Sequence, residues 1–572
     1  MAKIHTLKIS NFKGIKTFEQ TFHHKDFICI IGRGDSCKTT ILEAISLVLS
    51  PNWNIGFHDT DFYNCDTSQP ICIEATLYDI PDELLKENKY GKFKRFLDNN
   101  DEIIDDILDN NLNEDSDLLT IKLEVYKDLE PKWYIFNSRL NDEKIEISAK
   151  DRSKLNVFFI SENTDKHFSW SKGNPLYSIL QQEKSDNSDK NIVINAFREA
   201  KINIDNNSFS YLNNIVNKIN TNAKDFGVHI EEISTKIDFK DLLIKDNKLC
   251  LHDDKIPLRL KGKGSKRLIS IVIQHQLVKF GGILLIDEIE QSLEPDRVQH
   301  LVNVIKKNNQ NKGQIFITTH SRDVLVEIGA KDLFLMKKDS NNLIDFNEYK
   351  KEENIFDGCI RSNPEAFFAK KILICEGVTE IGIARALNDY RISNKLNNIS
   401  LLGIRYVDGR GDNLIEYAEK FLTCFNVGIF CDSDTKPLND KKPFLIDKGA
   451  KIFDCLENNS IEDQIFVDLP FEAIKELINY AIKEKEENSI SDQLNDYYHK
   501  SYQKNLPSEW INNDSSELRL ALGSISKKNK WFKRTDHGTF IGSVCCKYLL
   551  EMSEDKHLKI QINKIINWID NV

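Results

Sequence analysis

Two groups of residues in this chain have types and spacings that could do chemistry, and the first lies near the start. The stretch "FICIIGRGDSCKTT" (27–40) has the pattern of a buried strand, a turn of glycine and small polar residues, and the beginning of a helix. It fits the phosphate-binding pattern G-x-x-x-x-G-K-[ST] at every defined position but one, because Cys37 stands in place of the second glycine. In such a loop the lysine reaches the β- and γ-phosphates and the hydroxyl that follows binds Mg²⁺. We predict a nucleotide site formed by Gly32, Gly34, Asp35, Ser36, Cys37, Lys38, Thr39 and Thr40, with Thr39 as a ligand of the nucleotide's Mg²⁺.

Three later stretches carry the other parts of a nucleotide site. "GGILLIDEIE" (281–290) places four apolar residues before Asp287 and Glu288. An Asp here holds Mg²⁺ through water, and the Glu that follows can orient or deprotonate the attacking water. "QIFITTHS" (314–321) ends a strand in His320, and "LKGKGSKRLIS" (260–270) leads through Gly264 and Ser265 into a helix. We predict that these residues complete the site, with Glu288 catalytic.

In order and spacing these motifs resemble the head of an ABC-type ATPase of the SMC, RecF and Rad50 branch, for which the opening "IHTLKISNFKGIK" (4–16) is also typical. The resemblance implies that His320 senses the γ-phosphate, and that Gly264 and Ser265 reach the γ-phosphate bound by a partner subunit. It therefore implies ATP held between two heads of a homodimer or higher oligomer. Cys37 departs from the pattern, so we expect ATP binding to persist in a weakened or slower form.

The second group of chemical residues is a set of carboxylates at the ends of expected strands. In "KKILICEGVTEIGIARALNDY" (370–390) a strand ends in Glu376, and Glu380 follows one helical turn later. A later strand, "VGIFCDSD" (427–434), ends in Asp432 and Asp434. Parallel strands place their carboxyl ends along one edge, so these carboxylates should converge and repel one another unless a cation neutralises them. We predict that they bind Mg²⁺ or Mn²⁺.

This strand–helix series resembles the Toprim domain of topoisomerases, primases and nucleases. The resemblance extends to "NNSIEDQIF" (458–466), where Glu462 matches an acidic metal ligand of the OLD (overcoming lysogenisation defect) nucleases. It also extends to the basic, aromatic segment "SKKNKWFKR" (526–534), which resembles the element that carries the catalytic lysine in that family. Lys533 is the first candidate for that lysine and Lys530 the second.

The elements that must position these residues follow an α/β order. We predict an ABC-type head with its N-terminal part at 1–175, a helical insertion and candidate dimerisation arm at 176–235, and its C-terminal part at 236–345. The polar stretch 346–363 is predicted to be a linker, and 364–572 a Toprim domain.

Composition limits the class of protein. The 572 residues are 40% apolar and 29% charged, with a formal net charge of −11, which is typical of a soluble protein and argues against general coating of nucleic acid. No apolar stretch is long enough to span a bilayer and no secretory segment opens the chain, so we expect a cytoplasmic protein with no membrane partner. The 12 cysteines form no C-x-x-C pair, which favours free thiols.

An ABC head followed by a Toprim domain is the arrangement of OLD-family endonucleases, among them the A subunit of Gabija and retron-associated effectors. The resemblance implies an ATP-binding, metal-dependent DNA endonuclease in defence against phage, with a co-encoded partner such as a helicase-like protein or a reverse transcriptase with its RNA or DNA product. The alternative is a RecF- or SMC-like DNA-binding ATPase clamp whose Toprim-like domain is not catalytic. A topoisomerase would require an active tyrosine in a companion domain, and none can be identified here. A primase would require a zinc-binding segment, which is likewise not found.

Overall fold

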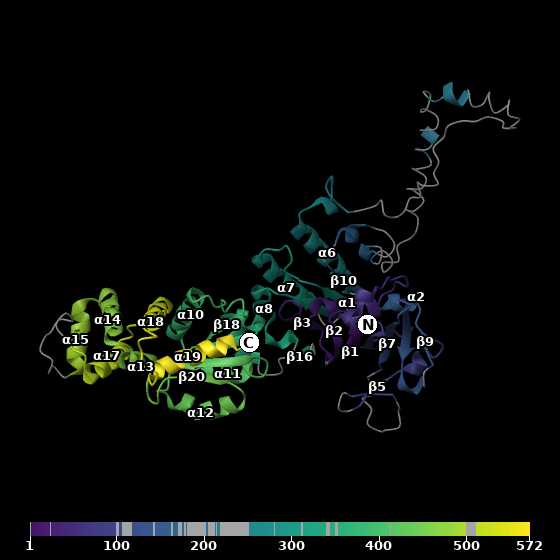
Figure 1. Ribbon diagram of the computed structural model, residues 1–572. Coiled ribbons are helices and arrows are strands. Elements are labelled where there is room, and N and C mark those ends of the chain that lie inside the picture. Colours follow the sequence, from purple (N-terminus) through teal and green to yellow (C-terminus); the bar gives the residue numbers. More distant parts are fainter. Residues whose placement is uncertain are drawn as a thin grey trace. The chain divides into compact units, whose positions relative to one another are not determined.

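The computed structural model of the chain is drawn in Figure 1. It describes residues 2–22, 24–98, 102–105, 117–140, 143–161, 164–169, 174–176, 179, 199, 202–203, 212, 214–217, 251–278, 281–309, 313–338, 344–348, 353–411, 413–498 and 511–571. The predicted helical insertion at 176–235 therefore lies almost wholly outside the described residues. Among the helices that the structure does describe, none is both long and apolar enough to cross a membrane.

The chain divides into two compact units. The first comprises Met1–Ile28 and Thr39–Thr318, and the second comprises Cys29–Lys38 and Thr319–Val572. This division differs from the boundary predicted at 346–363, because the strand that precedes the phosphate loop pairs with a strand that follows Thr319. The predicted α/β class is confirmed in both units.

The first unit begins with an antiparallel sheet in the order β2-β1-β4-β7-β8-β9. Most residues of its longer central strands are buried, at successive as well as alternate positions. The strands are β1 (Lys3–Phe12), β2 (Ile15–Thr21), β4 (Ile71–Tyr78), β7 (Leu119–Val125), β8 (Pro131–Phe136) and β9 (Ile145–Glu146). Two short hairpins accompany it: β5 (Phe96–Leu97) with β6 (Ile103–Ile104), and β11 (His252–Asp253) with β12 (Ile256–Pro257).

Three parallel strands of the first unit position one half of the predicted nucleotide residues. They are β10 (Val157–Ile160), β13 (Ile283–Ile286) and β14 (Gln314–Thr318), and β13 lies between the other two. All residues of β13 and β14 are buried, in keeping with the apolar runs ILLI and IFI that they contain. The helices are α1 (Lys38–Val48), α2 (Ala149–Arg152), α6 (Lys263–Val278) and α7 (Pro295–Asn309).

The second unit contains β3 (Phe27–Ile31), apart from its first two residues, and β15 (Leu333–Lys338), which pair in parallel. Strand β16 (Ile344–Glu348) pairs antiparallel with β15, and α8 (Arg322–Ile328) and α9 (Glu353–Ser362) follow β14 and β16. The predicted linker at 346–363 is wrong, because it holds the end of β16 and all of α9. Its sequence "ENIFDGCI" has apolar residues at helical spacing, and Cys359 and Ile360 are buried. The helix therefore packs against its own unit and is not an exposed linker.

A four-stranded parallel sheet, in the order β18-β17-β19-β20, forms the rest of the second unit. Its strands are β17 (Lys371–Cys375), β18 (Ile404–Asp408), β19 (Asn426–Cys431) and β20 (Lys451–Asp454). The helices are α10 (Val378–Ser393), α11 (Leu414–Phe421), α12 (Lys436–Asp447), α13 (Ile461–Asp468), α14 (Phe471–Lys485), α15 (Glu487–Tyr497), α17 (Ser516–Lys528), α18 (Thr535–Lys547) and α19 (His557–Asp570). Helix α19 lies against β20 (Figure 1). One apolar core joins the sheet to α10, α13, α17 and α18.

Candidate functional site

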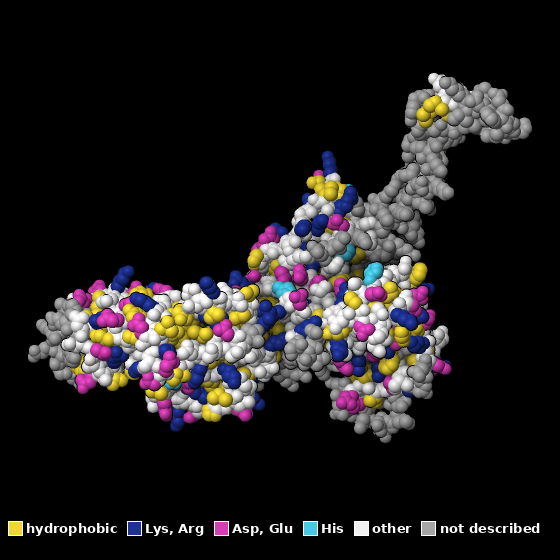
Figure 2. Space-filling view, in the orientation of Figure 1, with side chains coloured by type: hydrophobic (Ala, Val, Ile, Leu, Met, Phe, Trp, Pro, Cys, Tyr) yellow, Lys and Arg dark blue, Asp and Glu magenta, His cyan; other side chains and the backbone are white. Residues whose placement is uncertain are grey.

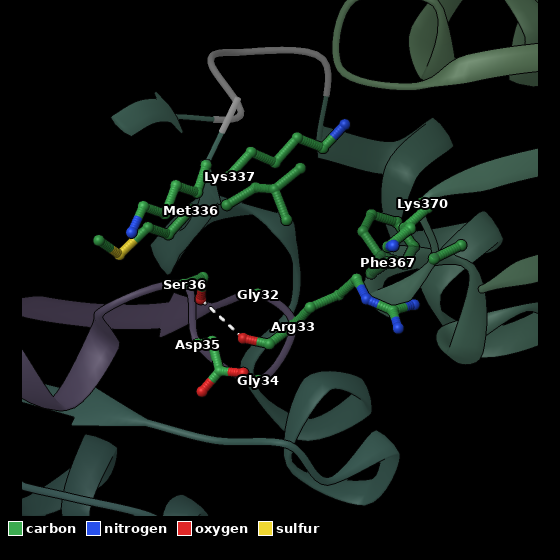
Figure 3. A pocket seen from close by; sticks show the side chains of 12 residues that line it. Gly32, Arg33, Gly34, Asp35, Ser36, Met336, Lys337, Phe367 and Lys370 are labelled. Atoms are coloured by element: carbon green, nitrogen blue, oxygen red, sulfur yellow. Dashed lines mark hydrogen bonds between the residues drawn. The ribbon is translucent and has the colours of Figure 1, made fainter. Parts of the chain in front are cut away.

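The phosphate loop connects β3 to α1, as predicted. Its lysine is 6% exposed, and its ammonium donates to the carbonyls of Gly32 (3.0 Å) and Arg33 (2.8 Å). The Ser36 hydroxyl donates to the same Arg33 carbonyl at 2.7 Å (Figure 3). These bonds satisfy the Lys38 charge within the loop itself, and a bound phosphate would have to replace them.

The side chains beside the loop are largely cationic. Figure 3 shows the Arg33 side chain directed away from the loop, toward Phe367 and Lys370. The guanidinium lies 3.5 Å from the Phe368 carbonyl, and a cavity of about 380 Å³ separates the loop from the end of β15. Lys337, Lys338 and Lys370 line that cavity together with Asp35, so an anion near the loop meets a positive field.

Cys37 has the backbone conformation that the pattern reserves for glycine. Its φ is +68°, in the left-handed region that side chains with a Cβ rarely adopt. Gly32 is required for another reason, since a Cβ there would lie 2.4 Å from the Met336 carbonyl oxygen. A Cβ on Gly34, by contrast, would meet nothing within 4 Å. Asp35 of the same loop is also left-handed, at φ +61°, so the position that departs from the pattern is one of two strained positions in the loop.

The first unit holds the acidic half of the nucleotide residues. The Thr39 hydroxyl donates to both oxygens of Asp287 at 3.0 and 3.1 Å, and the Thr318 hydroxyl donates to Oδ1 at 2.6 Å. A hydroxyl and a carboxylate this close can bind one hydrated Mg²⁺ together. Thr318 is a residue that the sequence did not single out. Thr40, one position along α1, is half-buried.

Glu288 is held in a left-handed backbone conformation just beyond β13. Its φ is +46°, its side chain is exposed, and its N–H donates to the Thr318 hydroxyl at 2.8 Å. Arg267 of α6, 3% exposed, donates to the carbonyls of Ser161 (2.6 Å), Glu288 (3.3 Å) and Asp287. Burial lowers the pKa of this guanidinium. Sequence analysis missed Arg267, although it stands in the predicted stretch 260–270.

Gly264 and Ser265 lie in the first turn of α6, which begins at Lys263, rather than in a loop before it. A Cβ on Gly264 would lie 2.6 Å from the Ser292 carbonyl oxygen, so the glycine permits a close approach of two backbones. A cavity of about 390 Å³ is lined there by Lys263, Lys266 and Arg267, and also by Asp165, which lies 2.8 Å from the Lys266 ammonium. His320, in the second unit, is exposed just beyond β14, and its ring centroid lies 6.3 Å from that of Phe368.

The predicted carboxylates converge at one edge of the four-stranded sheet. Strands β17 and β19 pair in parallel, so Glu376 and Asp432 leave adjacent strands at the same end. Glu376 Oε2 accepts the Asp432 N–H at 2.8 Å, and Glu380 Oε2 accepts the Gly377 N–H at 2.9 Å at the start of α10. Asp432 Oδ1 accepts the Ile461 N–H at 2.8 Å, which joins α13 to the same edge.

Helix α13 brings Glu462 into the set. Ser460 caps this helix and accepts the Asp463 N–H, while Asp463 Oδ2 accepts the Ser460 N–H at 3.1 Å. Glu462 is 1% exposed, and neither of its carboxylate oxygens accepts an aligned hydrogen bond. Two buried oxygens that no donor reaches in good alignment are costly, and the Lys533 ammonium, 3.1 Å from Oε1, offsets only part of that cost.

The carboxylates raise one another's pKa values. Burial raises the pKa of Asp432 to about 9, and the charges of Glu380, Glu376, Glu462 and Asp434 add to the effect. Burial raises the pKa of Glu380 to about 7, with Glu462 and Glu376 contributing. The pKa of Glu376 is also raised, first by burial and then by Asp434. Such a set favours either bound protons or a bound cation.

Two lysines of the predicted basic segment pair with the carboxylates. Lys533 Nζ lies 3.1 Å from Glu462 Oε1, and Lys527 Nζ donates to Asp434 Oδ2. Burial opposes the charge of each ammonium, yet the neighbouring carboxylates raise both pKa values. Lys530, the second candidate from the sequence, is exposed in a left-handed turn at φ +52°. The sequence missed Lys527, whose position in the last turn of α17 could have suggested it.

The residue types at this edge fit a divalent cation. Among the described residues, no three acidic, His or Cys side chains stand in an arrangement that holds a metal ion directly. The ammonium groups of Lys527 and Lys533 neutralise part of the set, so ion binding requires side chains to rearrange. The donors are all carboxylate oxygens, which Mg²⁺ and Mn²⁺ prefer, and the repulsion described above is what such a cation relieves.

Comparison with known proteins identifies the family. A family model described as an AAA ATPase domain matches residues 2–325, more than half of the chain. The protein called "Old nuclease" from Escherichia phage P2 is 23% identical over 452 residues, which cover 72% of this chain and 73% of that protein. The chain belongs to the family of proteins with an AAA ATPase domain, and its similarity to the Old nuclease supports the OLD-family resemblance. The family predicted from the motifs is thereby confirmed.

Solved structures similar to this chain include SMC heads and RecF. An SMC head bound to the C-winged helix domain of ScpA has 16% identity and a TM-score of 0.34, and covers 61% of this chain and 98% of its own. The SMC head domain from Thermotoga maritima has 12% identity and a TM-score of 0.28, covering 61% and 100%. The recombination mediator RecF with ATP has 12% identity and a TM-score of 0.32, covering 60% and 99%.

Proposed function

We propose that this chain is an ATP-binding, metal-dependent endonuclease that cuts DNA. Its ATPase domain family and its similarity to the Old nuclease support an ATPase joined to a nuclease. The observation that carries the proposal is the convergence of Glu376, Glu380, Asp432, Asp434 and Glu462 at one sheet edge, with lysine ammonium groups beside them. This arrangement supports the proposal of a Toprim domain.

The acidic edge supports hydrolysis of a phosphodiester. Glu376, Glu380, Asp432, Asp434 and Glu462 would hold Mg²⁺ or Mn²⁺. A bound divalent pair would make the attacking water nucleophilic and neutralise the leaving 3′-oxygen. Lys533, which faces the same carboxylates, would contribute a fixed positive charge to the phosphate in the transition state. Glu376 and Glu380 are oriented by backbone N–H groups, so their carboxylates stay in place as substrates come and go.

The nucleotide residues support ATP binding. Lys38 would move from the loop carbonyls to the phosphates, while Thr39 and Asp287 would share the nucleotide's Mg²⁺. Glu288 would orient the attacking water, and Arg267 fixes the turn that carries it. The lysine-lined cavity at the start of α6 supports contact with a γ-phosphate held by a second copy of the chain, hence an ATP-dependent homodimer.

The biological role that we propose is defence against phage, with a co-encoded component such as a helicase-like protein or a reverse transcriptase with its product. It is proposed from the family resemblance. Figure 2 is compatible with a local rather than a general DNA surface, because cationic and acidic side chains are intermixed over the visible face. A net charge of −11 likewise requires that DNA binding be local.

The test is cleavage of plasmid and linear DNA by the purified chain, with and without Mn²⁺ and with and without ATP. Glu376→Ala and Asp432→Ala should each remove cleavage, and so should EDTA, while ATP binding measured by titration stays unchanged. Lys38→Ala should abolish ATP binding. The matched control is Glu457→Ala, which removes an exposed carboxylate close to α13 and should cut as the wild type does.

The carboxylate variants decide between two functions. If Glu376→Ala or Asp432→Ala cuts DNA at the wild-type rate in Mg²⁺ or Mn²⁺, the nuclease assignment at this edge is wrong. An ATPase clamp that binds DNA, with a non-catalytic Toprim-like domain, then becomes the better description. Equal ATP affinity of the wild type and Lys38→Ala would refute the nucleotide site.

A further inference from the structure

A buried threonine connects the carboxylate edge to the segment that carries Lys533. Thr379 is 1% exposed and stands between Glu376, at the end of β17, and Glu380, in the first turn of α10. Its hydroxyl donates to the Phe532 carbonyl at 2.7 Å. Phe532 directly precedes Lys533. One hydrogen bond therefore joins the backbone next to the lysine to the helix turn that carries a carboxylate.

The helix that follows Lys533 packs unusually closely on the same turn. A Cβ on Gly538 of α18 would lie 2.2 Å from the Thr379 carbonyl oxygen, and a Cβ on Gly382 of α10 would lie 2.3 Å from the Thr535 carbonyl oxygen. Only glycine allows the two backbones to approach this far. The contact fixes the start of α18, and hence Lys533, against the first turns of α10.

The segment before Lys533 is also anchored. Trp531 is 1% exposed, its indole N–H donates to Gln493 Oε1 at 2.7 Å, and its backbone N–H donates to the Ser526 carbonyl at 2.9 Å. Phe532 is equally buried in the same core. Lys533 is the residue at which the chain leaves this core, with its side chain 43% exposed and its ammonium 3.1 Å from Glu462.

We infer that Thr379 is a positioning residue for Lys533: through its bond to the Phe532 carbonyl it holds the lysine ammonium at the carboxylate edge. The inference rests on the proposed nuclease function and adds a residue that neither the motifs nor the family match singles out. A lysine displaced by about 1 Å would stabilise the transition state far less, because catalytic effects depend steeply on geometry.

The test compares Thr379→Val, which keeps the shape but removes the hydroxyl, with Thr379→Ser, which restores it. We expect the Thr379→Val variant to have a kcat for DNA cleavage about 10- to 100-fold lower, with KM nearly unchanged. The Thr379→Ser variant should recover most of the rate. Mn²⁺ affinity, measured by calorimetry, should not change. Thr539→Val is the matched control, because the Thr539 hydroxyl donates to the Thr535 carbonyl of its own helix.

A double-mutant cycle with Lys533→Met separates positioning from general structure. If Thr379 acts through the lysine, Thr379→Val should cost almost nothing further in the Lys533→Met background. An equal loss in both backgrounds, failure of Ser to rescue, or loss of Mn²⁺ affinity would overturn the inference. If the Thr379→Val variant does not fold, as judged by thermal melting, Thr379→Ala takes its place in the cycle.

The outcomes also distinguish this inference from the function on which it rests. Full cleavage by Lys533→Met would remove the role of the lysine and the inference with it, whereas full cleavage by Glu376→Ala would refute the nuclease site. If both of those variants are inactive and Thr379→Val cuts normally, the positioning role alone is wrong.

Discussion

Cys37 is one of two non-glycine residues of the phosphate loop, with Asp35, that adopt a left-handed backbone conformation. A left-handed conformation costs an L-residue about 1–2 kcal/mol relative to glycine, and Cys37 adopts it at φ +68°. We therefore expect Cys37→Gly to raise the free energy of unfolding by about 1 kcal/mol and to preserve or tighten ATP binding. Denaturant melts and ATP titration measure the two effects.

Cys65 supplies the matched control, since it is exposed at φ +57° outside the phosphate loop. Cys65→Gly should relieve similar strain and leave ATP affinity as it is. Weaker ATP binding by Cys37→Gly than by the wild type would show that the cysteine side chain contributes to the site rather than straining it.

The raised carboxyl pKa values predict how metal-free protein responds to pH. Asp432, with a pKa of about 9, and Glu380, at about 7, hold protons in the folded chain that they lose in the unfolded chain near pH 4. Because the folded state then binds more protons, stability falls as pH rises from about 4 through 9. In EDTA, the melting temperature should decrease across this range.

A divalent cation should reverse this trend, because it binds the ionised carboxylates. The rise in melting temperature caused by Mn²⁺ should be larger at pH 8 than at pH 6. Asp432→Asn removes one titrating group and should flatten the metal-free profile, whereas Glu457→Gln should leave it unchanged. A metal-free profile that rises from pH 6 to 9 would contradict the prediction.

At the scale of elements, helix α19 is attached to helix α10 by a buried arginine. Arg391 of α10 is 0% exposed and donates to both Asp570 oxygens, at 2.7 and 2.5 Å. Asp570 is 41% exposed, so its removal leaves a buried guanidinium, whereas removal of Arg391 leaves a carboxylate that water can reach. Asp570→Ala should therefore cost about 2 kcal/mol of stability, and Arg391→Met less.

Denaturant melts of both variants measure this asymmetry. Asp447→Ala, at the end of α12, is the control, because Asp447 is exposed and should contribute little. If Arg391→Met destabilises the chain more than Asp570→Ala does, packing of the arginine stem outweighs the charge, and the helix is held mainly by apolar contacts.

Elements were predicted correctly from the sequence where an unbroken apolar run marked them. They were missed where apolar and charged residues alternate within one helix. Buried strands such as β13 and β17 read as apolar runs, so the residues at their ends could be placed correctly. Helix α9 was missed because its charged face hid a short apolar stripe. Lys527, Arg267 and Thr379 were missed because their roles come from tertiary hydrogen bonds between segments far apart in the chain, which no local spacing encodes.

At the scale of the whole molecule, the nucleotide residues predict association of two chains. Lysines and Arg267 line a cavity at the start of α6, and a helix N-terminus favours an anion. If this surface binds the γ-phosphate on a second chain, ATP should double the mass measured by light scattering. Glu288→Gln should prolong the dimer by slowing hydrolysis, since this side chain would no longer activate water.

Ser265 allows a sharp test of that association because it is exposed, so a larger side chain need not disturb the fold. Ser265→Arg in the Glu288→Gln background should keep ATP binding and remove the ATP-dependent dimer, since the added bulk would block the approach of a second chain. Ser543→Arg, which alters an exposed serine of α18 in the other unit, should dimerise normally. A monomer at every ATP concentration in the Glu288→Gln variant would contradict the shared site. A dimer that forms equally well with Ser265→Arg would instead place the interface elsewhere on the chain.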